Sequence, residues 1–329
     1  MFNIKAPMIR SALFFTLSIV ITDMLHLGMP VFSVFLGPAL ILRDKFSLNK
    51  SLVFISLISI YFISGSLAAT ILDHNQWALI VSSIFVIYSY LRIEKLASFS
   101  TAPVFLYCYG LINTTYGTSM ELYFYQLLHV AFMMLLLAKA IFWILPTPSN
   151  QMSSKQNQKV VKRSKALNVI STIIISLSLV YFLSIEVGKA IFCLSVIISI
   201  VCRPDYASII KGLKSILPLQ VSGCFIALIL HILVAGHGQN ILMLSLVIFG
   251  FSIVVFYFAH SSEKVSKKIP NFEIGLLAAT LTPFTLYTHS TGFDIGPFIR
   301  RATNMGVIWG LGTLMIVLLP WCLSWFKRI

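Results

Sequence analysis

The stretch MELYFYQLLHVAFMMLLLAKAIFWIL, residues 120–145, has the length and the composition of a membrane-spanning helix. It contains two charged residues, Glu121 and Lys139, and about 20 apolar residues suffice to cross the hydrocarbon core of a bilayer. The whole chain has this character, because 58% of its 329 residues are hydrophobic and 10% are charged. A soluble protein carries roughly 25% charged residues, so we predict an all-α polytopic membrane protein.

Similar apolar runs recur along the chain and predict about twelve transmembrane helices. They cover residues 11–28, 30–42, 51–72, 77–91, 99–116, 120–145, 166–185, 187–202, 215–235, 240–259, 272–290 and 299–326. An alternating path from a cytoplasmic N-terminus puts 20 of the 24 Lys and Arg residues on the cytoplasmic side. Cytoplasmic loops carry this excess, so both termini are predicted to be cytoplasmic. Anionic lipid at that face accounts for the net charge of +14, and no nucleic-acid partner is implied.

Residues 147–165, TPSNQMSSKQNQKVVKRSK, are the one long polar stretch and predict a flexible cytoplasmic linker. The linker separates two segments, residues 1–146 and residues 166–329, each with six predicted spans. The segments resemble each other, because Arg43-Asp44-Lys45-Phe46 falls on Arg203-Pro204-Asp205-Tyr206 at an offset of 160. An even number of spans returns the chain to the side where it began. We therefore predict two parallel six-helix repeats.

The second span of each predicted repeat is short. Residues 30–42, interrupted by Gly37-Pro38, and residues 187–202 would give helices of roughly 20 and 24 Å. Short or broken segments at corresponding places in two repeats indicate a substrate site, since unwound backbone needs a polar cavity. A thinner bilayer or a misplaced boundary explains them equally well.

The four basic residues outside the cytoplasmic group are candidates for substrate binding: Lys139, Lys189, Arg300 and Arg301. Charges within spans are costly and often functional, and a cavity lined by these four would attract anions. Alternatively, those near the outer surface reach the membrane interface with their long side chains.

Proton-coupling candidates are Asp23, His26 and Glu186, because a partly shielded carboxylate or imidazole can exchange a proton near neutral pH. Polar helix ends wetted by solvent are the alternative. His129 and His231 lie inside predicted spans, where a lone histidine is more often a packing residue than a proton relay.

The sequence has no phosphate-binding loop, no G-x-S-x-G, no H-E-x-x-H and no paired aspartate motif for Mg²⁺. Its five cysteines all fall in apolar segments without metal-ligand spacing. We therefore predict that the chain is not an enzyme and carries no metal or cofactor.

The region from Arg163 to Leu233 resembles the membrane repeat of the fusaric acid resistance and aromatic acid exporter superfamily. It has a basic entry, a helix, a short span, the motif Arg203-Pro204-Asp205-Tyr206 and a further helix. Many members carry a sizeable cytoplasmic domain, and here only the linker remains, as in the compact branch of the superfamily.

The resemblance implies a bacterial inner-membrane pump, driven by the proton gradient, that exports aromatic carboxylic acids or similar small organic anions. It also implies a periplasmic adaptor of the membrane-fusion, HlyD-like type, while a homo-oligomer is left open. The alternative from a different class is a membrane scaffold or accessory subunit of an envelope complex that transports nothing.

Overall fold

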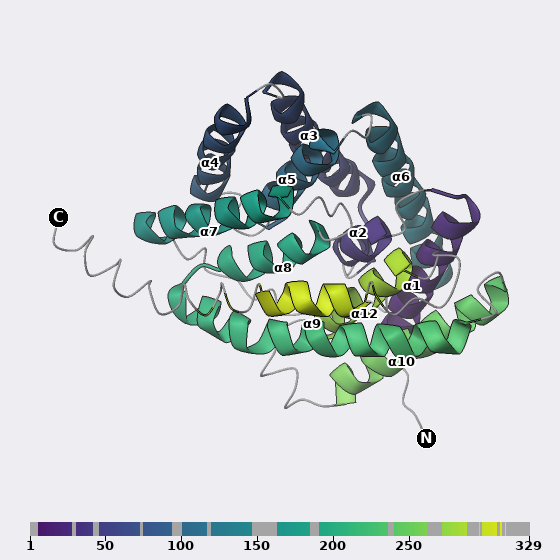
Figure 1. The fold of residues 1–329 in the computed structure, drawn as a ribbon. Helices are drawn as coiled ribbons and strands as arrows, with labels where there is room; N and C mark the ends of the chain where they lie inside the picture. The colour runs from purple at the N-terminus through teal and green to yellow at the C-terminus, as the bar shows by residue number, and fades with distance from the viewer. Residues whose placement is uncertain are drawn as a thin grey trace. The chain divides into compact units, whose positions relative to one another are not determined.

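The computed structural model describes residues 6–27, 31–41, 46–72, 75–93, 101–116, 120–146, 163–184, 191–235, 240–261, 272–287, 296, 298–307, 310 and 313. Within these ranges every regular element is an α-helix and no strand occurs. The helices with defined bounds are α1 Ala6–Met24, α2 Val31–Ile41, α3 Leu48–Ile71, α4 Gln76–Arg92, α5 Thr101–Thr115, α6 Met120–Ile144, α7 Lys165–Ser184, α8 Ile191–Val201, α9 Tyr206–Val234, α10 Ile241–Ser261 and α12 Phe272–Tyr287 (Figure 1). Residues 298–307 are also helical.

Six helices in the described part of the chain are long and apolar enough to cross a membrane. They are Pro7–Met24, Leu48–Ile71, Glu121–Ile144, Lys165–Ser184, Tyr206–Val234 and Ile241–Phe258, and Ile274–Tyr287 is a shorter apolar helix. The prediction of an all-helical protein of membrane type is therefore confirmed. The total of twelve spans stays a prediction.

Helices α9 and α1 each have one end that differs clearly from the sequence prediction. Helix α9 begins at Tyr206, nine residues before the expected start, because Asp205 caps it: the backbone amide of Ser208 donates to Asp205 Oδ2 over 3.0 Å, and the Ser208 hydroxyl donates to Oδ1 over 2.6 Å. Helix α1 ends at Met24, and His26 has a left-handed φ of 48°. At the start of α9, polar capping and not the apolar run sets the end of the helix.

The two predicted short helices are present and are shorter than predicted. Helices α2 and α8 have 11 residues each, a length of about 16 Å at 1.5 Å per residue. Their described side chains are mostly buried, among them Phe32 and Leu40 of α2 and Leu194 and Ile198 of α8. A helix buried on most sides belongs to the core of its unit.

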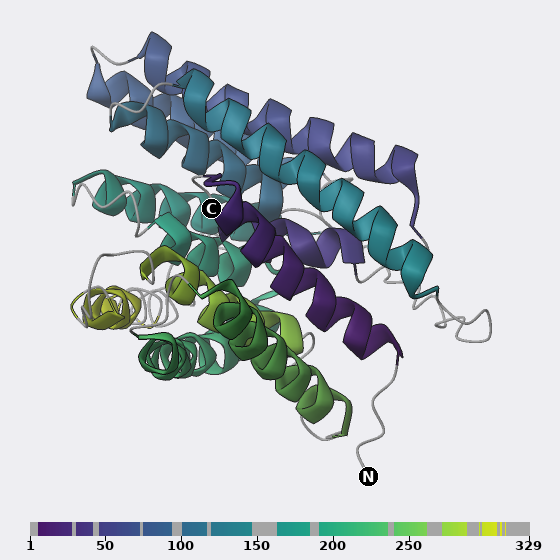
Figure 2. The ribbon, with the colours of Figure 1, turned by 90° about the vertical axis from the view of Figure 1, so that its right-hand side faces the viewer.

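The chain forms two compact units, each described here by itself. Unit 1 comprises Met1–Ile55, Tyr125–Asn157 and Leu219–Ala302. In it α1 packs against α10 and α2, α2 packs against α12, and α10 packs against α12. Figure 2 shows α1, in purple, and α10, in green, running side by side. The rings of Phe15 on α1 and Phe256 on α10 stack with centroids 6.4 Å apart.

Unit 2 comprises Ser56–Phe124, Gln158–Pro218 and Thr303–Ile329. In it α7 packs against α4 and α8, α8 packs against α5, and α4 packs against α5 (Figure 1). Unit 2 thus has the same helix pairings as unit 1, with α7, α8, α4 and α5 in the places of α1, α2, α10 and α12. Each unit combines helices from both sides of the linker.

Helix α5 is the innermost helix of unit 2, and every residue from Pro103 to Asn113 is buried. It crosses α3 where both helices have a glycine. A Cβ atom on Gly65 would collide with the carbonyl of Tyr107, and one on Gly110 would collide with the carbonyl of Phe62. The Ser66 hydroxyl donates to the Gly110 carbonyl over 3.3 Å. Small residues allow this close approach, which is typical of helix packing in membranes.

Candidate functional site

Among the predicted substrate-binding residues that the structure describes, Arg301 is the one that lies inside the protein. It belongs to the helical residues 298–307 and is 3% exposed, whereas the neighbouring Arg300 is exposed. Its guanidinium is in hydrogen-bonding contact with the thiol of Cys224 on α9. Successive helix residues differ in direction by about 100°, so one arginine of the pair faces the interior of unit 1 and the other does not.

Cys224 is part of a buried polar face on α9. Gln220, Cys224, Ala227 and His231 are all buried, and their spacing of four, three and four residues places them on one side of the helix. The Oε1 atom of Gln220 is buried and has no hydrogen-bond partner among the described residues. Such an atom in a native protein calls for a water molecule or a ligand.

Two aromatic rings extend this face. The His231 ring lies 5.5 Å from the Phe298 ring, and the Phe298 ring lies 5.2 Å from the Tyr287 ring of α12 in a T-shaped arrangement. We call the group Gln220, Cys224, His231, Tyr287, Phe298 and Arg301 the Arg301 cluster. All six residues belong to unit 1.

Close packing of α9 against α12 brings the parts of the cluster together. A Cβ atom on Gly223 would be 2.7 Å from the backbone carbon of Ala279, and one on Gly275 would be 2.9 Å from Leu219 Cδ2. Small residues at these crossings allow the two helices to approach each other closely. The Oγ1 atoms of Thr280 and Thr282 on α12 are buried and lack a hydrogen-bond partner in the described part of the chain.

The cluster joins a cation, a hydrogen-bonding amide, an imidazole and two aromatic rings. A guanidinium binds a carboxylate through two parallel charge-assisted hydrogen bonds. An imidazole changes its charge near neutral pH. The described residues contain no group of three His, Cys, Asp or Glu side chains that could hold a metal ion.

Lys139 lies on the exposed face of α6, whereas the residues of the Arg301 cluster are buried. It is five residues, about 7.5 Å, from the end of the helix at Ile144, so its side chain can reach the membrane interface. Trp143 on the same face is 85% exposed. This arrangement is typical of interfacial anchoring, and a role of Lys139 in substrate binding stays a prediction.

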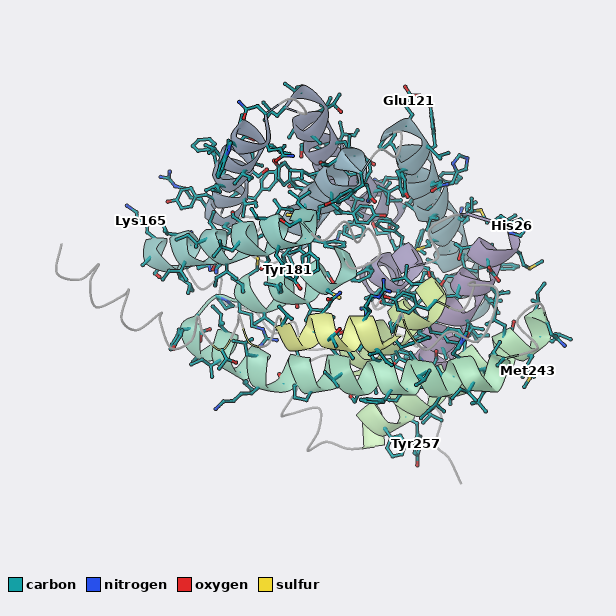
Figure 3. All side chains as sticks on the ribbon, in the orientation of Figure 1. His26, Glu121, Lys165, Tyr181, Met243 and Tyr257 are labelled. Atoms are coloured by element: carbon teal, nitrogen blue, oxygen red, sulfur yellow. The ribbon has the colours of Figure 1, made fainter. Side chains whose placement is uncertain are left out.

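The predicted proton-coupling residues Asp23 and His26 lie at the end of α1, where His26 is exposed (Figure 3). The backbone amide of His26 donates to the carbonyl of Asp23 over 2.9 Å. Glu186 and Lys189 lie outside the described residues. The sequence favoured His231 as a packing residue. In the structure it belongs to the Arg301 cluster, and its ring lies 5.5 Å from that of Phe298.

The motif Arg203-Pro204-Asp205-Tyr206 connects α8 to α9 in unit 2. The hydroxyl and the amide of Ser208 donate to the Asp205 carboxylate and hold its pKa below the usual value. Arg203 Nη1 donates to the Ser208 carbonyl over 3.1 Å, and burial lowers the pKa of this guanidinium. Gly212 leaves room for it, because a Cβ atom there would be 2.9 Å from Arg203 Nε. The motif thus builds a turn and a helix cap.

Arg163 is a structural residue whose contacts the sequence did not reveal. Its Nη2 atom donates to the Val201 carbonyl over 2.7 Å and to the Ser171 hydroxyl, and its guanidinium bonds to the Cys202 thiol. Burial lowers the pKa of Arg163 and raises that of Cys202. Arginine commonly binds the last carbonyls of a helix, and here it holds the C-terminal end of α8.

Tyrosines of unit 2 form a second polar group inside the fold. The hydroxyls of Ser83 and Tyr107 lie 3.1 Å apart, and those of Ser64 and Tyr90 lie 3.0 Å apart. The rings of Tyr90 and Tyr107 meet edge to face at 6.0 Å. Tyr107 is 1% exposed and is therefore a core residue of unit 2.

A scan against protein-family models, a search of curated proteins and a search of solved structures each found no match. The resemblance to the aromatic acid exporters therefore rests on the motif around Arg203 and Asp205 and on the order of the helices. The class of protein that the fold defines is an all-helical protein of membrane type.

Proposed function

We propose that this protein is a membrane transporter that moves small organic anions, with aromatic carboxylates as the substrate class. The observation that carries the proposal is the position of Arg301: its side chain is 3% exposed and its guanidinium contacts Cys224 on the polar face of α9, inside an apolar helical bundle. An ionisable residue at such a place in a membrane protein is a functional-site candidate by default. The substrate carboxylate would bind Arg301.

The neighbouring side chains support aromatic substrates. Phe298 and Tyr287 offer ring faces and edges near Arg301, and aromatic pairs prefer the edge-to-face and offset geometries that these two already adopt. Gln220 adds a hydrogen-bonding group on the same face of α9. A benzoate-like anion has the two features that this site matches, a carboxylate and an aromatic ring.

Coupling to protons is proposed at His231. It shares the buried face of α9 with Cys224, and its imidazole can take up a proton as the carboxylate enters or leaves. Asp23, His26 and Glu186 remain candidates from the sequence alone. The proposed location is the bacterial inner membrane with both termini in the cytoplasm, and the resemblance adds a periplasmic HlyD-like adaptor as the partner.

The proposal includes the two parallel six-helix repeats over residues 1–146 and 166–329, joined by the linker 147–165. Helices α2 and α8 support it, because both ends of α8 lie 160 residues after those of α2. Helices α4 and α10 both start directly after an asparagine. The Asn75 side chain accepts a hydrogen bond from a backbone amide of α4, and the Asn240 side chain accepts one from α10.

Buried small residues repeat in the same way. At the offset of 160, Ser11 on α1 matches Ser171 on α7 and Ser18 matches Ser178, and all four are buried. Gly65 on α3 and Gly223 on α9 both press against the backbone of a neighbouring helix. Matching burial at matching positions favours duplication over chance similarity of apolar helices.

Transport by purified protein in liposomes tests the function. We expect a pH step to drive uptake of a labelled hydroxybenzoate, and the variant Arg301→Gln to lose roughly 10- to 100-fold of the initial rate, the equivalent of a lost charge-assisted hydrogen bond. The matched control is Arg300→Gln, which removes the neighbouring exposed charge and should leave the rate within about twofold of the original. Equal rates in the two variants would refute the role of Arg301. Folded protein without uptake across a panel of aromatic carboxylates would favour the accessory-subunit alternative.

A further inference from the structure

We infer that the two sequence halves exchange their first two helices, so that each half completes the other and neither forms its compact unit alone. Unit 1 combines α1, α2 and α6 from Tyr125 onward, all of the first half, with the C-terminal part of α9, α10 and α12 of the second. Unit 2 combines α7, α8, the N-terminal part of α9 and the helical residues 303–307 of the second half with the C-terminal part of α3, α4 and α5 of the first. The inference rests on the packing and does not depend on transport.

The strongest helix pairings join different halves of the sequence. Helix α1 packs along α10 in unit 1, and α7 packs along α4 in unit 2. The short helices follow the same pattern, since α2 packs against α12 and α8 packs against α5. Under the proposed duplication these are equivalent pairs. The exchange is therefore made twice, in the same way.

Specific side chains carry these contacts. In unit 1, Phe15 of α1 stacks on Phe256 of α10. In unit 2, the hydroxyl of Tyr116, which follows α5, donates to the carbonyl of Leu183 near the end of α7. Each contact joins a residue before the linker to a residue after it.

The long helices α3 and α9 carry the chain from one set of partners to the other. The first residues of α3, up to Ile55, belong to unit 1 with α1 and α2, and the remainder belongs to unit 2. Helix α9 is divided in the opposite sense at Pro218, which lies inside the helix. Each division falls inside a continuous helix, so α3 and α9 each contribute residues to both units.

The faces of α1 and α2 therefore pack against α10 and α12 of the other half, and the faces of α7 and α8 pack against α4 and α5. A single half leaves the buried faces of α1 and α2, or of α7 and α8, without their helix partners. The chemically matched substitute is a second copy of the same half. A half expressed alone should therefore be degraded, aggregate or form a dimer.

Splitting the chain in the linker between Asn157 and Gln158 tests this. We expect the two halves, co-expressed with different affinity tags, to co-purify in mild detergent as a one-to-one complex with the size of the intact protein. Each half expressed alone should either give at least tenfold less detergent-solubilised protein than the co-expressed halves or purify as a dimer. A monodisperse monomer of one half, with helical content equal to its share of the intact protein, would overturn the inference.

Cysteine cross-linking in the intact chain gives a second, independent test. In a variant whose native cysteines are replaced, the pair Phe15→Cys and Phe256→Cys should form a disulfide on mild oxidation. The pair Phe15→Cys and Leu91→Cys should not, because it reports the arrangement without exchange, in which α1 would pack against α4. The equivalent second set tests α7. The pair Ile175→Cys and Leu91→Cys joins α7 to α4 and should cross-link, whereas the pair Ile175→Cys and Phe256→Cys joins α7 to α10 and should not.

The readout separates the two arrangements without reference to activity. A protease site in the linker allows the halves to be separated after oxidation. Exchanged pairs hold the two fragments together on a non-reducing gel, whereas the alternative pairs leave them apart and change only the mobility of one fragment. Cross-linking of the alternative pairs together with failure of the exchanged pairs would contradict the inference, even in a protein that transports normally.

Discussion

The guanidinium of Arg301 contacts the thiol of Cys224, and both side chains are buried in unit 1 although Arg300, one residue away, is exposed. This contact brings the positive charge of Arg301 to the polar face of α9. On that helix Cys224 lies four residues after Gln220 and seven before His231. In a bundle this apolar, a buried charge is costly, and a role in anion binding gives a physical reason for it.

Ligand binding should depend on Arg301 and not on Arg300. We expect benzoate-type anions at saturating concentration to raise the thermal unfolding midpoint of the purified protein, since a ligand that binds only the folded state stabilises it. The shift should disappear in Arg301→Gln and remain in Arg300→Gln. Thermal unfolding in detergent over a range of ligand concentrations measures it. An equal shift in both variants would place the binding site elsewhere.

His231→Gln should uncouple transport from the proton gradient. The amide keeps a hydrogen-bonding group in place but cannot take up a proton near neutral pH, so accumulation driven by a pH step should be lost while exchange of labelled for unlabelled substrate continues. The control is His129→Gln on the exposed face of α6, which should retain both activities. Retained accumulation in His231→Gln would assign coupling to another group, with Asp23, His26 and Glu186 the next candidates.

Gly110→Ala should destabilise unit 2. The added methyl group would collide with the Phe62 carbonyl at the crossing of α3 and α5, and overpacking of this kind costs about 1–3 kcal/mol. Gly250→Ala is the matched control, because a Cβ atom there meets nothing within 4 Å and alanine favours the helix by up to about 1 kcal/mol. Thermal unfolding of the two variants compares them. Equal stability would mean that α3 and α5 do not cross at Gly110.

Asp205 should make stability depend on acid. Its folded-state pKa is lowered by hydrogen bonds from Ser208, so the stabilisation is present above its ordinary pKa of 3.8 and is lost as the pH falls below that value. Asp205→Ala should cost about 0.5–2 kcal/mol at neutral pH through loss of the cap. Asp205→Asn should keep the cap and remove this acid dependence. Unfolding midpoints between pH 3 and 7 test the prediction, and an unchanged acid dependence in Asp205→Asn would rule out this carboxylate as its source.

Arg163→Ala should loosen the end of α8. The change removes the guanidinium that binds the Val201 carbonyl, the Ser171 hydroxyl and the Cys202 thiol, and hydrogen bonds from charged groups contribute about 1.5–3 kcal/mol. Cys202 should then react faster with maleimide, because the guanidinium no longer covers it. Lys165→Ala, two residues away and exposed, is the control that should react at the original rate.

Composition and periodicity alone determined the class of the protein. So few charges among so many apolar residues leave room only for helices that face lipid or one another, and the described helices lie where the apolar runs predicted them. The short helices α2 and α8 were visible in the same way, since charged residues limit the apolar runs, although Gly37 and Pro38 lie inside α2 and do not interrupt it. The start of α9 was missed, because a single capping contact between Asp205 and Ser208 outweighed the pattern of the following residues.

Tertiary structure decided which of two adjacent arginines is buried and which helices pack together. Arg300 and Arg301 are equivalent in sequence, and only the rotation of their helix against α9 distinguishes them. Local similarity can suggest repeats, but the pairing of α1 with α10 and of α7 with α4 depends on contacts between residues more than 70 positions apart, such as Phe15 with Phe256. In the proposed repeats equivalent helices offer similar surfaces, so sequence similarity does not select the partner; the helix contacts show which partner is used.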